Sequence, residues 1–513
     1  MTDDDYFKDI NFPELVFGLV GPIGVNMDDV QHGLIDALSQ VGYRTELIHL
    51  TRLLTKYEKD IHGPKQSTIY ADKIATANAF CSTADNGAAM AALAISEIRS
   101  IRGSQPKVKD ETDAERSRRA KPKTAYIVRQ LKREDEVELL RNVYGAKFLQ
   151  ISVSLDKDAR IENLTNKLSK EHPGLTADAC EKSARDLVAT DEHQLNEDGS
   201  DTNYGQQVGD IFHLGDFFVD GREATKISSK IQHFIKAFFG DNKISPTKDE
   251  FGSYMAAAAA LRSVDLSRQV GAAILTEHGD IVSLGCNEVP KAGGGNYWYD
   301  DDPRVRDIER GSEQNSVERQ RIIVDFFQKL RDSGLIETKT SLDTPEMKAK
   351  LESAVEDALI SDITEYGRMT HAEMSAICDA ARLGRALRGT TLFVTTFPCH
   401  NCAKHIVASG IDRVVFVEPY PKSRAPSSHT DSITVGLPTQ EKVSFEHFEG
   451  VSPKRYRDIF QKKKRRKGST IQKWYEGEPM PRMHQRDNLH VQKEAFAVSS
   501  TLAKLKEAER LKE

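Results

Sequence analysis

The chain has 513 residues, which is long enough for two or more domains of ordinary size. Its formal net charge of −6 at pH 7 gives no overall attraction to polynucleotides or acidic membranes. Six cysteines are too few for a disulfide framework, and the acidic amino-terminal stretch MTDDDYFKDI lacks an apolar secretion segment. No apolar run reaches membrane-spanning length. These features predict that the protein is located in the cytoplasm, a reducing compartment.

The amino-terminal half opens with an apolar run, a glycine-rich turn and a helical pattern, the setting that a phosphate-binding loop requires. The consensus G-x-x-x-x-G-K-[ST] aligns from Gly21. The chain then has Asn26, Met27 and Asp28 in place of the second glycine, the lysine and the hydroxyl residue. The stretch resembles the start of the P-loop nucleotide kinases, so we predict a degenerate P-loop kinase-like domain over residues 1–245.

Strands and helices alternate through the rest of this half, which predicts a mostly parallel sheet with covering helices. The predicted strands are 124–128 and 147–153, and the predicted helices are 134–143, 158–170 and 177–189. Three functions are open for this domain: an active kinase, a nucleotide-sensing module and a structural remnant. The missing lysine argues against the kinase. A bound nucleotide would use the loop at Gly21, Gly24 and Asn26.

The composition changes over residues 238–247, and we predict a second domain over residues 246–460. An alanine-rich helical stretch at 254–263 leads into a predicted hairpin, with strands at 268–275 and 281–285 joined by a tight turn.

Two short motifs in this domain indicate a metal site: Thr370-His371-Ala372-Glu373 and Pro398-Cys399-His400-Asn401-Cys402. A catalytic zinc takes three protein ligands and keeps one open position, and Cys₂His is an accepted set. His371 falls near the start of a predicted helix, while Cys399 and Cys402, three apart, share one surface of another. The positive helix ends favour thiolates. A structural zinc, the alternative, is usually closed by four ligands, and no second Cys-x-x-Cys pair exists.

Glu373 lies two positions after a ligand, and side chains two apart do not share a helix face. It is therefore free to address a substrate, as a general base and then a general acid. His-x-Glu followed by Pro-Cys-x-x-Cys is the signature of the zinc-dependent nucleobase deaminases. The helix, hairpin, helix, strand and helix order matches the cytidine deaminase-like α/β/α fold.

The hairpin and a later turn resemble the deoxycytidylate deaminases more narrowly. Gly285-Cys286-Asn287-Glu288-Val289-Pro290 is similar to the G-Y-N-G-x-P run of that family. The resemblance implies that Asn287 contacts the deoxyribose and that Tyr420 lies against the base. Lys422 and Ser423 have the chemistry for contacts with phosphate.

A long connection, residues 293–365, separates Asn287 from the first metal motif, and a loop of that size within a compact domain is usually functional or an inserted lid. It carries a predicted helix at 317–330. Tyr297 or Trp298 is a candidate for stacking on a base, with core packing as the alternative. Residues 461–513 are predicted to form a basic tail, either disordered or RNA-binding, with an exposed helix near its end.

The combination of both domains resembles the bacterial anti-phage dCTP/dCMP deaminases. That resemblance implies zinc-dependent deamination of dCTP and dCMP to the uracil nucleotides, control by a small partner RNA, and a homo-oligomer. A deaminase of bases in tRNA or single-stranded DNA shares the motif and is the alternative, although such proteins usually present a basic, aromatic surface. A housekeeping dCMP deaminase and a zinc-stabilised nucleotide sensor are further alternatives.

Overall fold

The structure is a computed structural model that describes residues 10–56, 68–192, 194, 204–336, 341, 344–356, 358–437, 439, 441–462, 464–474, 479–484 and 486–505. The chain divides into two compact units. The first unit is Met1–Glu250 with His447–Glu513, and the second unit is Phe251–Glu446. The predicted boundary at residue 246 lies close to the observed one. The predicted end of the second domain at residue 460 is wrong, because the chain returns to the first unit at His447.

The first unit is built on a six-stranded sheet with the order β12-β5-β4-β1-β3-β2. Its strands are β1 (Leu15–Val20), β2 (Arg44–His49), β3 (Thr124–Leu131), β4 (Phe148–Ser154), β5 (Phe217–Asp220) and β12 (Gly450–Val451). Strands β1 to β5 are parallel to their neighbours, and β12 joins the edge antiparallel to β5. The predicted α/β class with a mostly parallel sheet is confirmed.

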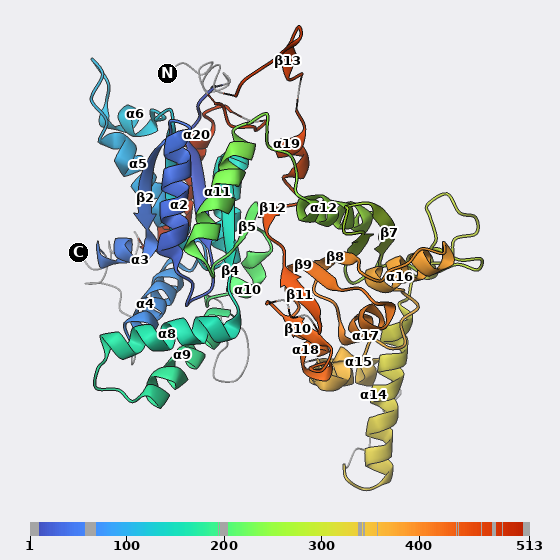
Figure 1. Cartoon of the computed structure of the whole chain (residues 1–513). Helices are drawn as coiled ribbons and strands as arrows, with labels where there is room; N and C mark the ends of the chain where they lie inside the picture. Colours follow the sequence, from blue (N-terminus) through green and yellow to red (C-terminus); the bar gives the residue numbers. More distant parts are fainter. Residues whose placement is uncertain are drawn as a thin grey trace. The chain divides into compact units, whose positions relative to one another are not determined.

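Helices cover both faces of this sheet, because alternate side chains of each buried strand point to opposite sides. In β1, Val16 belongs to one apolar cluster and Phe17 to the other. One face is covered by α4 (Ile69–Ala84), α5 (Ala89–Gly103), α7 (Glu134–Tyr144) and α20 (His490–Thr501). The opposite face is covered by α2 (Met27–Gln40) and α11 (Ala224–Phe238), as Figure 1 shows.

The remaining elements of the first unit connect or flank these layers. Helices α8 (Lys157–Glu171) and α9 (Ala177–Glu192) pack on each other. The shorter elements are α3 (Leu50–Leu53), α6 (Asp113–Arg118), α10 (Val208–Phe212), α19 (Tyr456–Phe460), β13 (Arg466–Lys467) and β14 (Thr470–Ile471).

The C-terminal segment is an integral part of the first unit, so the prediction of a tail with an exposed helix is wrong. Helix α20 buries one face against α5 and α7. On that face, the Arg102 guanidinium donates to Glu494 at 2.5 and 2.7 Å and to Glu14 at 2.9 Å, and all three side chains are buried. A helix that satisfies a buried arginine in this way cannot be an appended extension.

Described residues of the basic run, Lys462 and 464–467, also belong to the first unit. Lys462 donates hydrogen bonds to the carbonyl groups of Asp241 and Ile244. Residues 466–471 form the small antiparallel hairpin of β13 and β14, with exposed side chains. Lys462 is therefore committed to the fold.

The second unit has a mixed sheet with the order β10-β11-β9-β8-β6-β7. Its strands are β6 (Gly271–Leu275), β7 (Ile281–Cys286), β8 (Thr391–Thr396), β9 (Arg413–Glu418), β10 (Ile433–Val435) and β11 (Val443–His447). Its helices are α12 (Lys248–Ala260), α13 (Asp307–Arg310), α14 (Gln314–Asp332), α15 (Pro345–Ala354), α16 (Ala372–Arg382), α17 (His400–Ser409) and α18 (Ala425–Ser428). The predicted hairpin, central strand and two motif helices are confirmed as β6–β7, β8, α16 and α17.

Helix α16 lies unusually close to β7. Its sheet-facing side is a stripe of alanines at helical spacing, Ala372, Ala376 and Ala380, all fully buried. Opposite them, a Cβ atom at Gly285 would lie 2.1 Å from the Ala372 carbonyl oxygen. Small residues on both sides therefore set the depth at which the helix rests on the sheet.

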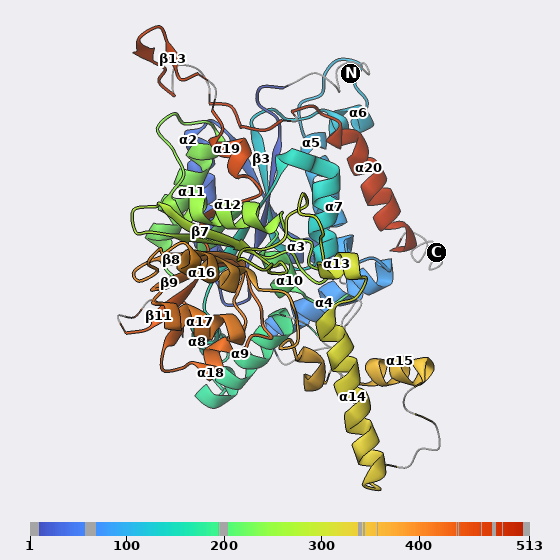
Figure 2. The same cartoon turned by 90° about the vertical axis from the view of Figure 1, so that its right-hand side faces the viewer.

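The 293–365 insertion contains helices rather than an irregular loop. Helix α14 contains the predicted stretch 317–330, and α15 packs beside it around Ile323 and Leu351 (Figure 2). Every helix within the described ranges falls short of the length and apolar content that a bilayer crossing requires.

We expect Glu494→Ala to lower the free energy of unfolding by about 3–5 kcal/mol, because it leaves the buried Arg102 charge without its two shortest hydrogen bonds. Glu181→Ala, which breaks an exposed pair with Arg185, should cost about 0–1 kcal/mol. Urea unfolding of both variants tests the difference, and equal costs would contradict the assigned role of α20.

The same cluster makes stability depend on acid. Burial opposes ionisation of Glu14, but the Arg102 charge and the hydrogen bond with His490 outweigh it and lower its pKa from 4.5 to about 2. The contribution is therefore fully present above about pH 4.5 and is lost as the pH falls toward 2. In urea titrations at several pH values, Glu14→Gln should reduce the change of the unfolding free energy with pH below about pH 4.5. An unchanged pH dependence would exclude Glu14 as its source.

Candidate active site

The structure brings the three predicted metal ligands together. The Nδ1 atom of His371 lies 3.4 Å from the sulfur of Cys399 and 3.4 Å from the sulfur of Cys402. All three ligand atoms lie within 4.8 Å of one another. Cys402 is fully buried, whereas His371 and Cys399 are partly exposed toward a cavity.

Two helix starts position these ligands. His371 is the N-cap residue of α16, and Cys399 is the N-cap residue of α17, with Cys402 in the first turn of α17. The positive ends of both helices therefore face the cluster and favour anionic sulfur. Helix α17 ends at Gly410 in the left-handed conformation, a common helix stop.

These residues fit a tetrahedral zinc ion. Ligands bound at about 2.0–2.3 Å in tetrahedral geometry lie roughly 3.4–3.8 Å apart, the spacing found between His371 and each sulfur. One imidazole and two thiolates leave the fourth position open toward the cavity, as a catalytic site requires.

The electrostatics of the cluster favour a thiolate before any metal binds. The hydrogen bond from the Cys402 thiol lowers the pKa of Cys399 to about 4 and raises the pKa of Cys402 well above its ordinary value. The hydrogen bond to Cys399 raises the pKa of His371 to about 9. Metal binding therefore has to displace protons from His371 and Cys402.

Glu373 lies beside this cluster, in the first turn of α16. It is only 4% exposed and lines the same cavity as His371 and Cys399. Burial raises the pKa of its carboxyl group above the ordinary value. This placement agrees with a carboxylate that meets a bound molecule instead of the metal.

The cavity has a volume of about 620 Å³. His371 and Cys399 of the metal cluster line it, and the segment between Asn287 and the metal motif contributes lining residues within 313–319 and 359–367. His400 of the metal motif lies 3.6 Å from Glu365 of that segment. The insertion is therefore part of the site itself.

Three of the four predicted substrate residues line this cavity: Asn287, Tyr420 and Lys422. Asn287 accepts a hydrogen bond from the Ala372 amide at 2.9 Å and donates to Asp265 at 2.9 Å, so it also fixes the start of α16. Ser423 is not in the lining, because its hydroxyl donates to the Pro398 carbonyl at 2.7 Å.

The aromatic residues proposed in the insertion are not placed for stacking on a ligand in this cavity. Trp298 is 53% exposed and packs under the Arg262 guanidinium, whose carbon lies 3.6 Å from the ring centroid. Neither Trp298 nor Tyr297 lines the cavity.

Three arginines in the cavity wall were missed by sequence reasoning: Arg268, Arg319 and Arg424. Arg319 comes from α14 and donates to the Ser361 carbonyl at 3.0 Å, while Arg268 pairs with Glu418 at 3.1 Å. No motif marks them, although Arg268 is the first residue of the predicted hairpin and Arg424 directly follows Ser423.

The predicted nucleotide-binding loop in the first unit connects β1 to α2, as expected. Of its three predicted residues, Gly24 lines a cavity of about 210 Å³ in the first unit, and Gly21 and Asn26 are not in the lining of that cavity. Gly24 has φ +96°, and a Cβ atom there would lie 2.7 Å from the Arg160 carbonyl of α8, which explains the glycine by packing. The Asn26 amide donates to Asp29 at 2.7 Å. Binding of a nucleotide by Gly21, Gly24 and Asn26 stays a prediction.

Residues 246–418 match the family model for the cytidine and deoxycytidylate deaminase zinc-binding region. This stretch contains the three ligands and Glu373. The second unit therefore carries a cytidine/deoxycytidylate deaminase-type domain with a deaminase-like fold, and zinc is its cofactor.

Particular relatives match over shorter stretches. The deoxycytidylate deaminase of Enterobacteria phage T2 is 48% identical over 54 residues, which are 10% of this chain and 29% of that protein. ComE operon protein 2 of Bacillus subtilis (strain 168) is 32% identical over 90 residues, 15% of this chain and 48% of that protein. The chain thus spans less than half the length of either relative.

Among solved structures, the dCMP deaminase of cyanophage S-TIM5 in complex with dCMP and dUMP is 17% identical. The alignment covers 40% of this chain and 99% of that one, with a TM-score of 0.22.

We expect Cys402→Ala to lose tightly bound zinc, because two ligands cannot hold the ion against competing chelators. Cys378→Ala is the matched control, since Cys378 is an exposed cysteine of α16 outside the cluster. Elemental analysis after dialysis should find about one zinc ion per chain in the control and in the parent protein. A full complement of zinc in Cys402→Ala would contradict the ligand assignment.

Proposed function

We propose that the protein hydrolyses the amino group of deoxycytidine nucleotides, converting dCMP and dCTP to dUMP and dUTP. The observation that carries this proposal is the buried Glu373 carboxylate beside a His-Cys-Cys cluster, both lining one cavity of about 620 Å³. The match of residues 246–418 to the deaminase family supports the reaction class.

When bound by His371, Cys399 and Cys402, zinc supplies Lewis acidity that makes a water molecule a nucleophile near neutral pH. Glu373 takes a proton from the attacking water through its carboxylate and delivers it to the ring nitrogen beside the attacked carbon. It then takes the second proton from the hydroxyl group formed on that carbon and delivers it to the amino group, which leaves as ammonia while the carbonyl forms. Because Glu373 is buried next to the cluster, it needs no large movement between these steps.

The cavity wall offers separate places for the base and for the phosphates. Tyr420 supplies an aromatic side chain to the cavity lining. Lys422 and Arg424 are exposed cations of the same lining, Lys422 lying 3.5 Å from Asp362, and Arg319 adds a third cation from the insertion. Several cations in one lining suit a ligand with one to three phosphate groups.

We also propose the biological setting that the sequence resemblance implies: depletion of cytosine nucleotides in anti-phage defence, in a homo-oligomer controlled by a partner RNA. The exposed β13–β14 hairpin carries Arg466 and Lys467 and is the best candidate for contact with RNA. Adding RNA from infected and uninfected cells to purified protein, with ammonia release as the readout, tests this control. If no RNA fraction changes the rate of ammonia release, the proposed control by RNA is wrong.

Deamination of bases in tRNA or single-stranded DNA is the competing reaction. The inserted wall beside the metal cluster and the small net charge of −6 favour a free nucleotide. Incubation with dCMP, dCTP, cytidine and a cytosine-containing oligonucleotide separates the two. Turnover of the oligonucleotide alone would overturn the proposal.

Glu373→Gln should retain zinc and lose turnover of dCMP by about 10²–10⁴-fold or more, because the amide cannot accept and return the proton. Zinc content and ammonia release measured on one preparation test this. Wild-type rates in the zinc-loaded variant would refute the assigned role.

Lys422→Ala should raise KM for dCMP and dCTP by about tenfold with little change in kcat, because a cation of the cavity lining binds the phosphates equally in the ground and transition states. Lys404→Ala, an exposed lysine of α17 outside the cavity lining, should leave both constants unchanged. A fall in kcat at constant KM would instead place Lys422 in the chemical step.

A further inference from the structure

The first unit has a cavity of its own, with a volume of about 210 Å³. Its floor is formed by the segments that leave the carboxyl ends of three parallel strands: 22–25 after β1, 49–51 after β2 and 129–133 at the end of β3. The chain runs from the central β1 to β2 and β3 on one side, then crosses to β4 and β5 on the other. Ligands of open α/β sheets bind at this kind of switch point, outside the carboxyl strand ends.

The glycine-rich loop itself is closed to phosphate by an acidic side chain of the same chain. The Ile23 amide donates to Asp191 Oδ2 at 2.6 Å, and Lys132 donates to Asp191 Oδ1 at 2.6 Å. Lys132 also donates to the Gly21 carbonyl at 3.0 Å. The Asp191 carboxylate of α9 thus accepts hydrogen bonds from the Ile23 amide and from the Lys132 ammonium group. In an intact phosphate-binding loop, groups of these two kinds would bind the phosphate.

The rest of the cavity still carries more positive than negative charge. Its cationic lining residues are Lys73, Arg129, Lys132, Arg133 and Lys167. Its two carboxylates are already occupied: Asp191 as above, and Glu136 by Arg133 at 2.9 Å. Arg129 is paired with Asp28, whereas Lys73 and Lys167 form no ion pair with any residue in the described ranges. Such a concave, unbalanced site attracts an anion.

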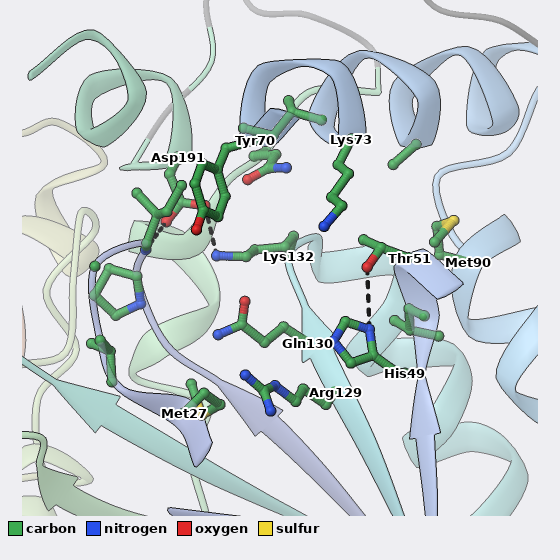
Figure 3. A pocket seen from close by; sticks show the side chains of 18 of the residues that line it. Met27, His49, Thr51, Tyr70, Lys73, Met90, Arg129, Gln130, Lys132 and Asp191 are labelled. Carbon is green, nitrogen blue, oxygen red and sulfur yellow. Dashed lines mark hydrogen bonds and ion pairs between the residues drawn. The ribbon is translucent and has the colours of Figure 1, made fainter. Parts of the chain in front are cut away.

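Figure 3 shows how these groups are aimed. Lys73 reaches into the cavity from α4, while Arg129 and Gln130 project from β3 on the opposite side. Burial, with help from the charges of Arg129 and Lys73, lowers the pKa of His49 to about 4, so this histidine adds no charge at neutral pH.

One buried acceptor in the lining lacks a partner. Gln206 is 5% exposed, and its Oε1 atom accepts no hydrogen bond in the described part of the protein. A buried amide oxygen without a donor is costly, and an N–H or O–H group of a ligand would satisfy it. The remaining lining is apolar or aromatic: Leu50, Tyr70, Ile74, Met90 and Leu164.

We propose that this cavity binds a nucleoside monophosphate, with its phosphate at the unpaired Lys73 and Lys167, its ring on the apolar lining, and a hydrogen-bond donor at Gln206. The phosphate would lie beside the glycine-rich loop and not on it, because Asp191 occupies the loop. Lys132 stays with Asp191, so the site binds its ligand without transferring a phosphoryl group. The inference does not depend on the deamination reaction.

Calorimetric titration of the full chain carrying Glu373→Gln tests the proposal, with AMP, GMP, CMP and UMP as probes. We expect at least one of them to bind at one site per chain, about tenfold or more tighter than its nucleoside, inorganic phosphate or ATP. Lys73→Glu and Lys167→Glu should each weaken that binding at least tenfold, with Lys73→Gln intermediate. Gln206→Met should weaken nucleotide binding while leaving that of inorganic phosphate unchanged.

The matched control is Lys170→Glu, an exposed lysine of α8 one turn beyond Lys167 and outside the lining. It should change the affinity less than twofold, and Lys422→Ala in the second unit should leave it unaltered. Unchanged thermal unfolding midpoints confirm that the charge reversals fold. The proposal is overturned if no monophosphate binds, if inorganic phosphate or ATP binds as tightly, if Lys170→Glu weakens binding as much as Lys73→Glu, or if Lys422→Ala abolishes it.

Discussion

The candidate metal site of the second unit depends on how closely α16 packs against β7. His371 caps this helix and Glu373 lies in its first turn, so the depth of the helix fixes both a metal ligand and the proposed proton carrier. A side chain at Gly285 would meet the helix backbone at 2.1 Å, which no rotamer change can relieve. The alanine stripe of α16 and the hydrogen bond from the Ala372 amide to Asn287 also hold the helix close to the sheet. Metal geometry and catalytic geometry are thus consequences of backbone packing.

In each unit, backbone groups at the ends of helices or strands interact with an anionic group, but the anion differs between the two units. In the second unit, two helix starts converge on sulfur and imidazole, where their positive ends stabilise the anionic form. In the first unit, the Ile23 amide of the glycine-rich turn donates to the carboxylate of Asp191. An anion from the chain itself therefore satisfies this backbone donor. The cavity beside it keeps its unpaired cations, and this contrast separates a site for binding from a site for chemistry.

Sequence reasoning was reliable for elements whose residues are close together in the chain. The strand at β8, the hairpin β6–β7 and the metal-motif helices follow from local periodicity and stop signals. It failed for the C-terminal segment. The bonds that join Arg102 to Glu494 span 392 residues, and local composition there shows only charge and helix propensity. A helix whose charged residue is buried looks solvent-exposed until its partner is known.

The amino-acid sequence by itself predicted the His-Cys-Cys cluster, the carboxylate of Glu373 beside it and the alternating α/β pattern, because each depends on spacing within one or two elements. Only the tertiary structure decided that the insertion walls the active-site cavity with Arg319, that Ser423 serves a turn, and that Asp191 closes the glycine-rich loop. Those outcomes depend on pairs such as Ile23 and Asp191, 168 residues apart, which meet only when helices pack around a common sheet. Spacing along the chain specifies a local geometry, whereas charge balance in a cavity is a property of the folded chain.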